Sequence, residues 1–159
     1  MSKITKADIE RLVREIKALL ERSHLASEVS IYHNGNGIRS KTEYDSEYNA
    51  TYTWVKTNNV DPHDYFEYAA YDHILSMSFE GGLYDLLNYS GGSKMDKFMK
   101  IFEKYGLYYE LGNAWNLTCC LIDSNTEVEY TCYEEPKEII YLNRFDFSNP
   151  SELQNIMDI

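Results

Sequence analysis

The chain has 159 residues, with 15 lysines and arginines against 26 aspartates and glutamates, so its formal net charge is −11. This length and a hydrophobic content of 43% are ordinary for one packed domain and argue against a mainly disordered chain. No stretch approaches the roughly 18 apolar residues of a membrane span, and the charged N-terminus lacks a signal-peptide core. The acidic excess argues against direct binding to DNA or RNA, where lysine and arginine supply most of the affinity. We therefore expect a soluble, cytoplasmic protein.

The first predicted element is an amphipathic helix over residues 6–22. Apolar residues recur at helical spacing from Ile9 onward, with charged residues on the opposite face. Thr5 and Asp8 fit an N-terminal capping box, and Ile4 and Ile9 occupy the positions of a hydrophobic staple.

Three strands are predicted after this helix. Residues 28–33 and 38–44 flank two successive Asn-Gly pairs, the strongest short signal for a β-hairpin. Tyr52 and Trp54 belong to an alternating pattern over about 48–56, which predicts the third strand.

The middle of the chain has a mixed pattern. Asp61 as N-cap and Pro62 at the first helical position predict a helix to about residue 71 or 73. Residues 74–80 alternate as in a strand, with a continued helix as the competing interpretation, and residues 83–87 fit a short helix.

A third long helix and a β-rich remainder complete the prediction. Ser93 is the expected cap of the helix, and Gly106 stands where a C-terminal glycine belongs. Strands are expected as an antiparallel meander over 107–111, 114–122 and 126–133, with a fourth strand over 138–145 and a short helix from Asn149. The order of elements predicts a single α+β domain over 1–159, in which 57–93 is an irregular acidic connecting region.

The sequence contains no pattern that predicts a cofactor, a metal site or a catalytic residue. Cys119, Cys120 and Cys132 are an odd number of cysteines in a chain without a secretory signal, so we expect no disulfide framework. Their spacing does not match the usual zinc pairs, and we interpret them as small apolar residues on strands.

The charge is unevenly distributed along the chain. Residues 1–41 carry a net charge of +3, residues 42–93 carry −8, and residues 94–159 carry −6. In the middle segment the acids alternate with tyrosines, which are enriched at recognition surfaces. This pattern predicts a docking face for a basic protein partner, and a merely solvated acidic surface is the alternative. The residues predicted to form the face are Glu43, Tyr44, Asp45, Glu47, Tyr48, Asp61, Asp64, Tyr65, Glu67, Tyr68, Tyr71 and Asp72.

This profile, a small acidic and tyrosine-rich chain without enzyme motifs, resembles the DNA-mimicking anti-restriction and anti-CRISPR proteins of phages and mobile elements. The resemblance is one of composition and assigns no role to any residue. It implies a non-enzymatic inhibitor that occupies the basic nucleic-acid-binding groove of a host defence nuclease.

Three other functions stay open. One is an immunity protein or antitoxin that neutralises a basic toxin. Another is a small metal-dependent or hydrolytic enzyme that uses His63, His73 and nearby carboxylates. The last is a structural phage or scaffold component. The sequence leaves the oligomeric state open.

Overall fold

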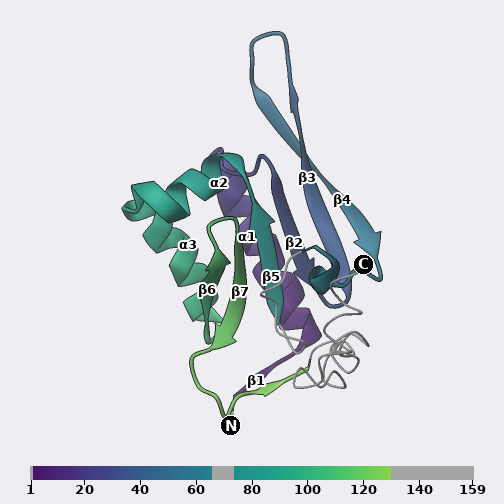
Figure 1. Ribbon diagram of the computed structural model, residues 1–159, viewed down its shortest axis with the longest axis vertical. Helices are drawn as coiled ribbons and strands as arrows, with labels where there is room; N and C mark the ends of the chain where they lie inside the picture. The colour runs from purple at the N-terminus through teal and green to yellow at the C-terminus, as the bar shows by residue number, and fades with distance from the viewer. Residues whose placement is uncertain (1, 66–73, 130–159) are drawn as a thin grey trace, which may run out of the picture.

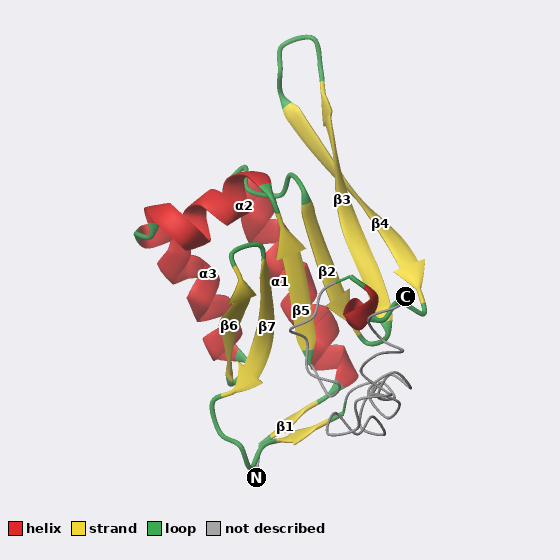
Figure 2. Cartoon of the chain, in the orientation of Figure 1, coloured by secondary structure: helices red, strands yellow, loops and turns green. Residues whose placement is uncertain are grey.

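The computed structural model describes residues 2–65 and 74–129, and its elements form the α+β architecture expected from the sequence. Two helices, α1 (Lys6–Arg22) and α3 (Ser93–Lys104), cover one face of a six-stranded antiparallel sheet (Figures 1 and 2). Among the described helices, none combines the length and the apolar character needed to cross a bilayer. In spatial order the strands are β4 (Ala50–Asn58), β3 (Asn36–Tyr44), β2 (Val29–His33), β5 (Leu75–Phe79), β7 (Asn116–Leu121) and β6 (Leu107–Asn113).

Helix α1 begins and ends where its sequence pattern predicts. The Thr5 hydroxyl accepts a hydrogen bond from the Asp8 backbone N–H at 3.1 Å, and the Asp8 carboxylate accepts one from the Thr5 backbone N–H at 2.8 Å. Ile4 and Ile9, the expected staple residues, are both buried in the main core. The capping box and the apolar stripe therefore fix both the start of the helix and the face that it presents to the sheet.

The first hairpin turns at Asn34 and Gly35, the first of the two Asn-Gly pairs. Both residues have positive φ, 48° and 76°, as the tight two-residue turn requires. Because His33 pairs with Asn36, strand β3 begins two residues earlier than expected. Strands β3 and β4 then pair over nine residues and project beyond the rest of the sheet as a long arm (Figure 1).

Strand β5 confirms the strand interpretation of residues 74–80 over the helical one. It pairs with β2 on one side and β7 on the other, so a part of the acidic middle segment is a central strand. Asp61 caps a turn as predicted, but the described helical part is a single 3-10 turn, η1 (Pro62–Asp64). The rest of that predicted helix, residues 66–73, lies outside the described residues.

The helical region after β5 comprises α2 (Gly81–Asp85) and η2 (Leu86–Ser90), followed by α3. The prediction that Ser93 caps α3 is wrong, because Gly91 and Gly92 both adopt positive φ and the chain is already helical at Ser93. Gly106 ends α3 as predicted, with a φ of 74° and its N–H donating to the Glu103 carbonyl at 2.9 Å.

The second β-rich part forms the hairpin of β6 and β7, but the expected third meander strand pairs elsewhere. Its described residues, β8 (Glu127–Val128), pair in parallel with β1 (Lys3–Ile4) instead of with β7. Thr126 lies five residues beyond the end of β7 at Leu121, and the chain there reaches the start of α1 (Figure 1). The strand predicted over 138–145 and the helix predicted from Asn149 lie outside the described residues.

The two faces of the sheet differ in chemistry because successive side chains point to opposite sides. The helix-facing positions of β2 and β5, such as Ile31, Met77 and Phe79, are fully or almost fully buried. The opposite positions of the same strands carry Ser30, Tyr32 and other polar residues. The sheet thus has one apolar face under the helices and one polar face on the other side.

Candidate functional site

The described residues of the predicted docking face fall into two groups at opposite ends of the β3–β4 arm. Glu43, Tyr44, Asp45, Glu47 and Tyr48 form its tip, which we call the hairpin tip. Asp61, Asp64 and Tyr65 lie at or next to η1, beyond the other end of β4. Eight residue steps separate these ends, about 26 Å at the usual rise of a strand. The structure therefore does not bring the two groups together, and Glu67, Tyr68, Tyr71 and Asp72 lie outside the described residues.

The Asp45 carboxylate organises the hairpin tip. Its Oδ1 accepts hydrogen bonds from the backbone N–H groups of Glu47 and Asn49, each at 2.9 Å, and its Oδ2 accepts one from the Asn49 amide at 3.1 Å. The bond from the Asn49 backbone is the main reason why the pKa of Asp45 lies below its ordinary value. Asp45 therefore both builds the turn and carries a negative charge there.

Tyr48 has an unusual conformation for a tyrosine. Its φ is +64°, in the left-handed region that favours glycine and asparagine, and the residue is 85% exposed. Tyr44, in the neighbouring strand, is 64% exposed. A strained backbone that presents a large ring to solvent contributes nothing evident to the fold, and such outliers are concentrated at functional sites.

The charges of the tip are only weakly compensated. Residues 43–48 contain three acids and no basic residue. Glu43 lies 3.7 Å from the Lys41 ammonium, with both side chains about two-thirds exposed, so this ion pair is worth little. The tip is thus an exposed anionic end with two exposed aromatic rings.

The η1 group has mainly structural contacts. The Asp61 carboxylate accepts the His63 backbone N–H at 2.9 Å, and the His63 Nδ1 atom lies 2.5 Å from the same oxygen. Tyr65 stacks on Tyr32 with ring centroids 5.5 Å apart. In residues 2–65 and 74–129, no three histidine, cysteine or acidic side chains are placed to hold a metal ion, and His73 lies outside these ranges.

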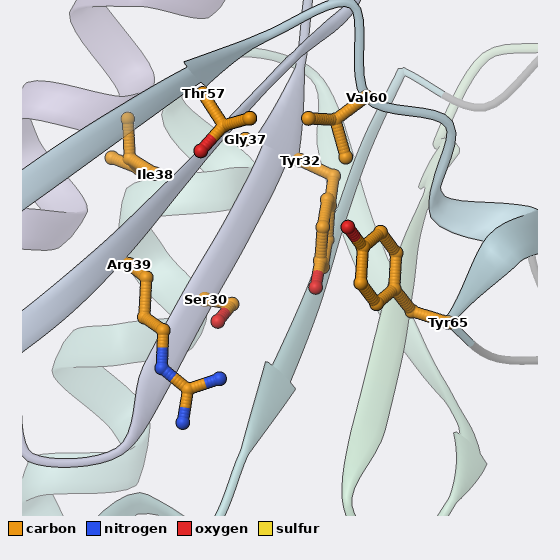
Figure 3. Close-up of a pocket in the computed structure, with 8 residues that line it drawn as sticks. All are labelled: Ser30, Tyr32, Gly37, Ile38, Arg39, Thr57, Val60 and Tyr65. Atoms are coloured by element: carbon orange, nitrogen blue, oxygen red, sulfur yellow. The ribbon is translucent and has the colours of Figure 1, made fainter.

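A pocket of about 210 Å³ lies on the polar face of the sheet beside this stack (Figure 3). Tyr32 and Tyr65 form one wall, and Arg39 lies on the other side of Ser30. No sequence pattern had predicted this pocket. The register of the first hairpin could have indicated it, because this register pairs Ser30 with Arg39 and so places both side chains on one face of the sheet.

The cysteines in the described part of the chain lie on β7, as predicted. Burial raises the pKa of the Cys119 thiol well above its ordinary value, and burial is also the main cause of the raised pKa of Cys120. Both thiols are therefore protonated at neutral pH and poor nucleophiles. Cys132 lies outside the described residues.

Comparisons with protein-family models, with curated proteins and with solved structures find no match to this chain.

Proposed function

We propose that this protein is a non-enzymatic inhibitor that docks the hairpin tip into the basic nucleic-acid-binding groove of a partner protein, such as a host defence nuclease. The observation that carries the proposal is the tip itself. Three acids and two exposed tyrosines stand at the end of an arm that projects beyond the sheet (Figure 1). A groove lined with lysine and arginine attracts a matching anion, and the tyrosine rings supply rigid contact area once the charges meet.

The arm also explains how such a contact avoids disturbing the fold. The ladder of β3 and β4 is anchored at its middle, where the indole N–H of Trp54 donates to the Glu21 carboxylate of α1 at 2.8 Å. At the tip, Asp45 holds the turn from within. The docking element is therefore preorganised, which lowers the entropy cost of binding.

The test compares three forms of the protein as bait in lysate of the cells in which it acts. The first is the wild type, the second carries Glu43→Lys and Glu47→Lys, and the third carries Glu103→Lys and Glu129→Lys as the matched control. Asp45 is kept because it builds the turn. Both double variants change the net charge by the same amount, but Glu103 and Glu129 are exposed on α3 and directly after β8, outside the β3–β4 arm.

We expect a basic nucleic-acid-binding protein to be captured by the wild type and the control, and to be lost with the tip variant. Capture should also weaken from about 50 mM to about 500 mM salt, because the Debye length shortens several-fold. Equal capture by all three forms would contradict the proposal. Recovery of a basic toxin in place of a nucleic-acid-binding protein would favour the immunity-protein alternative.

A further inference from the structure

A second pocket lies at the end of the sheet where the arm projects, and it has a different composition from the pocket in Figure 3. Its volume is about 390 Å³, and its lining residues are Glu80, Gly81, Tyr84 and Trp115. They come from the end of β5, from α2 and from the turn between β6 and β7, which lie together at that end of the sheet (Figure 1). The pocket thus combines one carboxylate with two large aromatic rings.

Hydrogen bonds from three elements hold the backbone that carries the aromatic walls. The Asn88 amide of η2 donates to the Tyr84 carbonyl at 2.9 Å and to the Ala114 carbonyl at 2.6 Å, which joins the helical region to the β6–β7 turn. Trp115 donates its backbone N–H to the Asn113 side chain and accepts one from the Phe79 N–H, both at 2.9 Å. Tyr84 is further held edge-on by Tyr89, with ring centroids 6.0 Å apart. Fixed walls of this kind are what a specific binding site requires.

The carboxylate of the pocket is available to a ligand. Glu80 is exposed, and within the described residues no hydrogen bond or ion pair engages its carboxylate. Trp115 is 39% exposed although its backbone is fully engaged. A negative charge beside aromatic faces is the arrangement that attracts an organic cation, since the faces of the rings carry negative charge density.

We infer that the pocket formed by Glu80, Tyr84 and Trp115 binds the guanidinium group of an arginine side chain. Arginine matches the pocket because its planar group stacks on aromatic rings while it forms a bidentate pair with a carboxylate. That this arginine belongs to the partner rests on the proposed function, which requires a basic partner. The elements that carry the pocket residues, α2 and the end of β5, lie toward the same end of the molecule as the hairpin tip (Figure 1), so one basic surface is able to meet both.

The test titrates the isolated 159-residue protein with N-acetyl-arginine amide and follows the indole N–H signals by NMR. The chain has two tryptophans, so a spectrum of Trp115→Phe assigns the signal of the pocket. The neutral control ligand is N-acetyl-citrulline amide, which has nearly the same shape without the charge. We expect a saturable shift of the Trp115 signal with a dissociation constant of the order of 10 mM, and at least tenfold weaker binding of the citrulline compound.

Two variants separate the pocket from a general effect of acidity. Glu80→Gln should weaken binding of the arginine compound at least fivefold, whereas Glu103→Gln, an exposed carboxylate on α3, should leave it unchanged. Equal shifts with both compounds, or unchanged binding in Glu80→Gln, would overturn the inference. This experiment needs no partner, so its failure refutes the pocket alone, while capture that survives charge reversal at the tip refutes the proposed function alone.

Discussion

Replacement of Tyr48 by asparagine tests whether the hairpin tip is shaped for binding or for stability. The left-handed conformation of Tyr48 costs about 1–2 kcal/mol for an ordinary L-residue, and asparagine tolerates it better. The lost ring contacts are small, because the residue is 85% exposed. If a buried tyrosine covers about 200 Å², roughly 30 Å² is lost here, worth about 0.8 kcal/mol.

The two effects nearly cancel, so Tyr48→Asn should leave the free energy of unfolding unchanged or raise it by up to about 1 kcal/mol. For a chain of this size, 1 kcal/mol moves the midpoint of thermal unfolding by about 2–4 °C. Tyr44→Asn is the matched control, since Tyr44 lies in the extended strand β3 and is less exposed. That change should destabilise the protein by about 1–3 kcal/mol, through lost contacts and the poor β-propensity of asparagine.

Thermal and urea unfolding followed by circular dichroism measure the stability of both variants. The affinity for the partner should fall at least tenfold with Tyr48→Asn, because exposed aromatic anchors contribute strongly to protein interfaces. If Tyr48→Asn destabilises the protein as much as Tyr44→Asn, the ring supports the fold and our reasoning about the tip is refuted.

Three further predictions concern the fold. Burial is the main cause that lowers the pKa of His33 below its ordinary value of 6.5, despite the Glu10 carboxylate 3.3 Å away. Because the unfolded chain binds the proton more readily, the contribution of His33 to the free energy of unfolding is complete above pH 6.5 and decreases as the pH drops toward the pKa in the folded state. His33→Gln should reduce this decrease, as measured by urea unfolding at several pH values. Glu21→Ala should cost about 1–2 kcal/mol in urea unfolding and change the emission of Trp54, which loses its hydrogen-bond acceptor. Phe102→Ala should cost about 3–5 kcal/mol in thermal unfolding, because Phe102 is fully buried.

Matched variants make the last two of these outcomes specific. Glu28→Ala breaks only an exposed ion pair with Arg39 and should change stability by less than about 0.5 kcal/mol. Met99→Ala, on the more exposed side of α3, should cost much less than Phe102→Ala. If a control variant changes stability as much as the variant it is compared with, the contact assigned to that variant is not the cause of the change.

Local sequence signals predicted the local structure well. The capping box at Thr5, the Asn-Gly turn at residues 34 and 35 and the glycine at residue 106 each act within a few residues, and each is found as expected. The prediction that Ser93 caps α3 was wrong because Gly91 and Gly92 adopt backbone conformations that few other residues reach, and these move the start of α3. The preference of serine for the N-cap position is thus weaker than the effect of two adjacent glycines on where the helix begins.

Long-range pairing was beyond the reach of these signals. Residues near Glu127 alternate like a meander strand, but alternation does not state which strand is the partner, and the segment pairs with Lys3 and Ile4. The distance between the two described groups of the predicted docking face was beyond these signals for the same reason. The residues of this face are neighbours in sequence, yet β4 carries the chain about 26 Å away from the tip before Asp61 is reached. The pocket of Glu80 and Trp115 joins residues far apart in sequence, so composition alone did not reveal it.

The most direct test of the docking role places a photo-crosslinking phenylalanine derivative at position 48 in cells. The control places it at Tyr108, an exposed residue on β6 at the other edge of the sheet. We predict that the position 48 probe crosslinks to a basic nucleic-acid-binding protein and that the position 108 probe does not crosslink to that protein. Crosslinking of the same protein from position 108 but not from position 48 would contradict the central claim that the hairpin tip is the docking element.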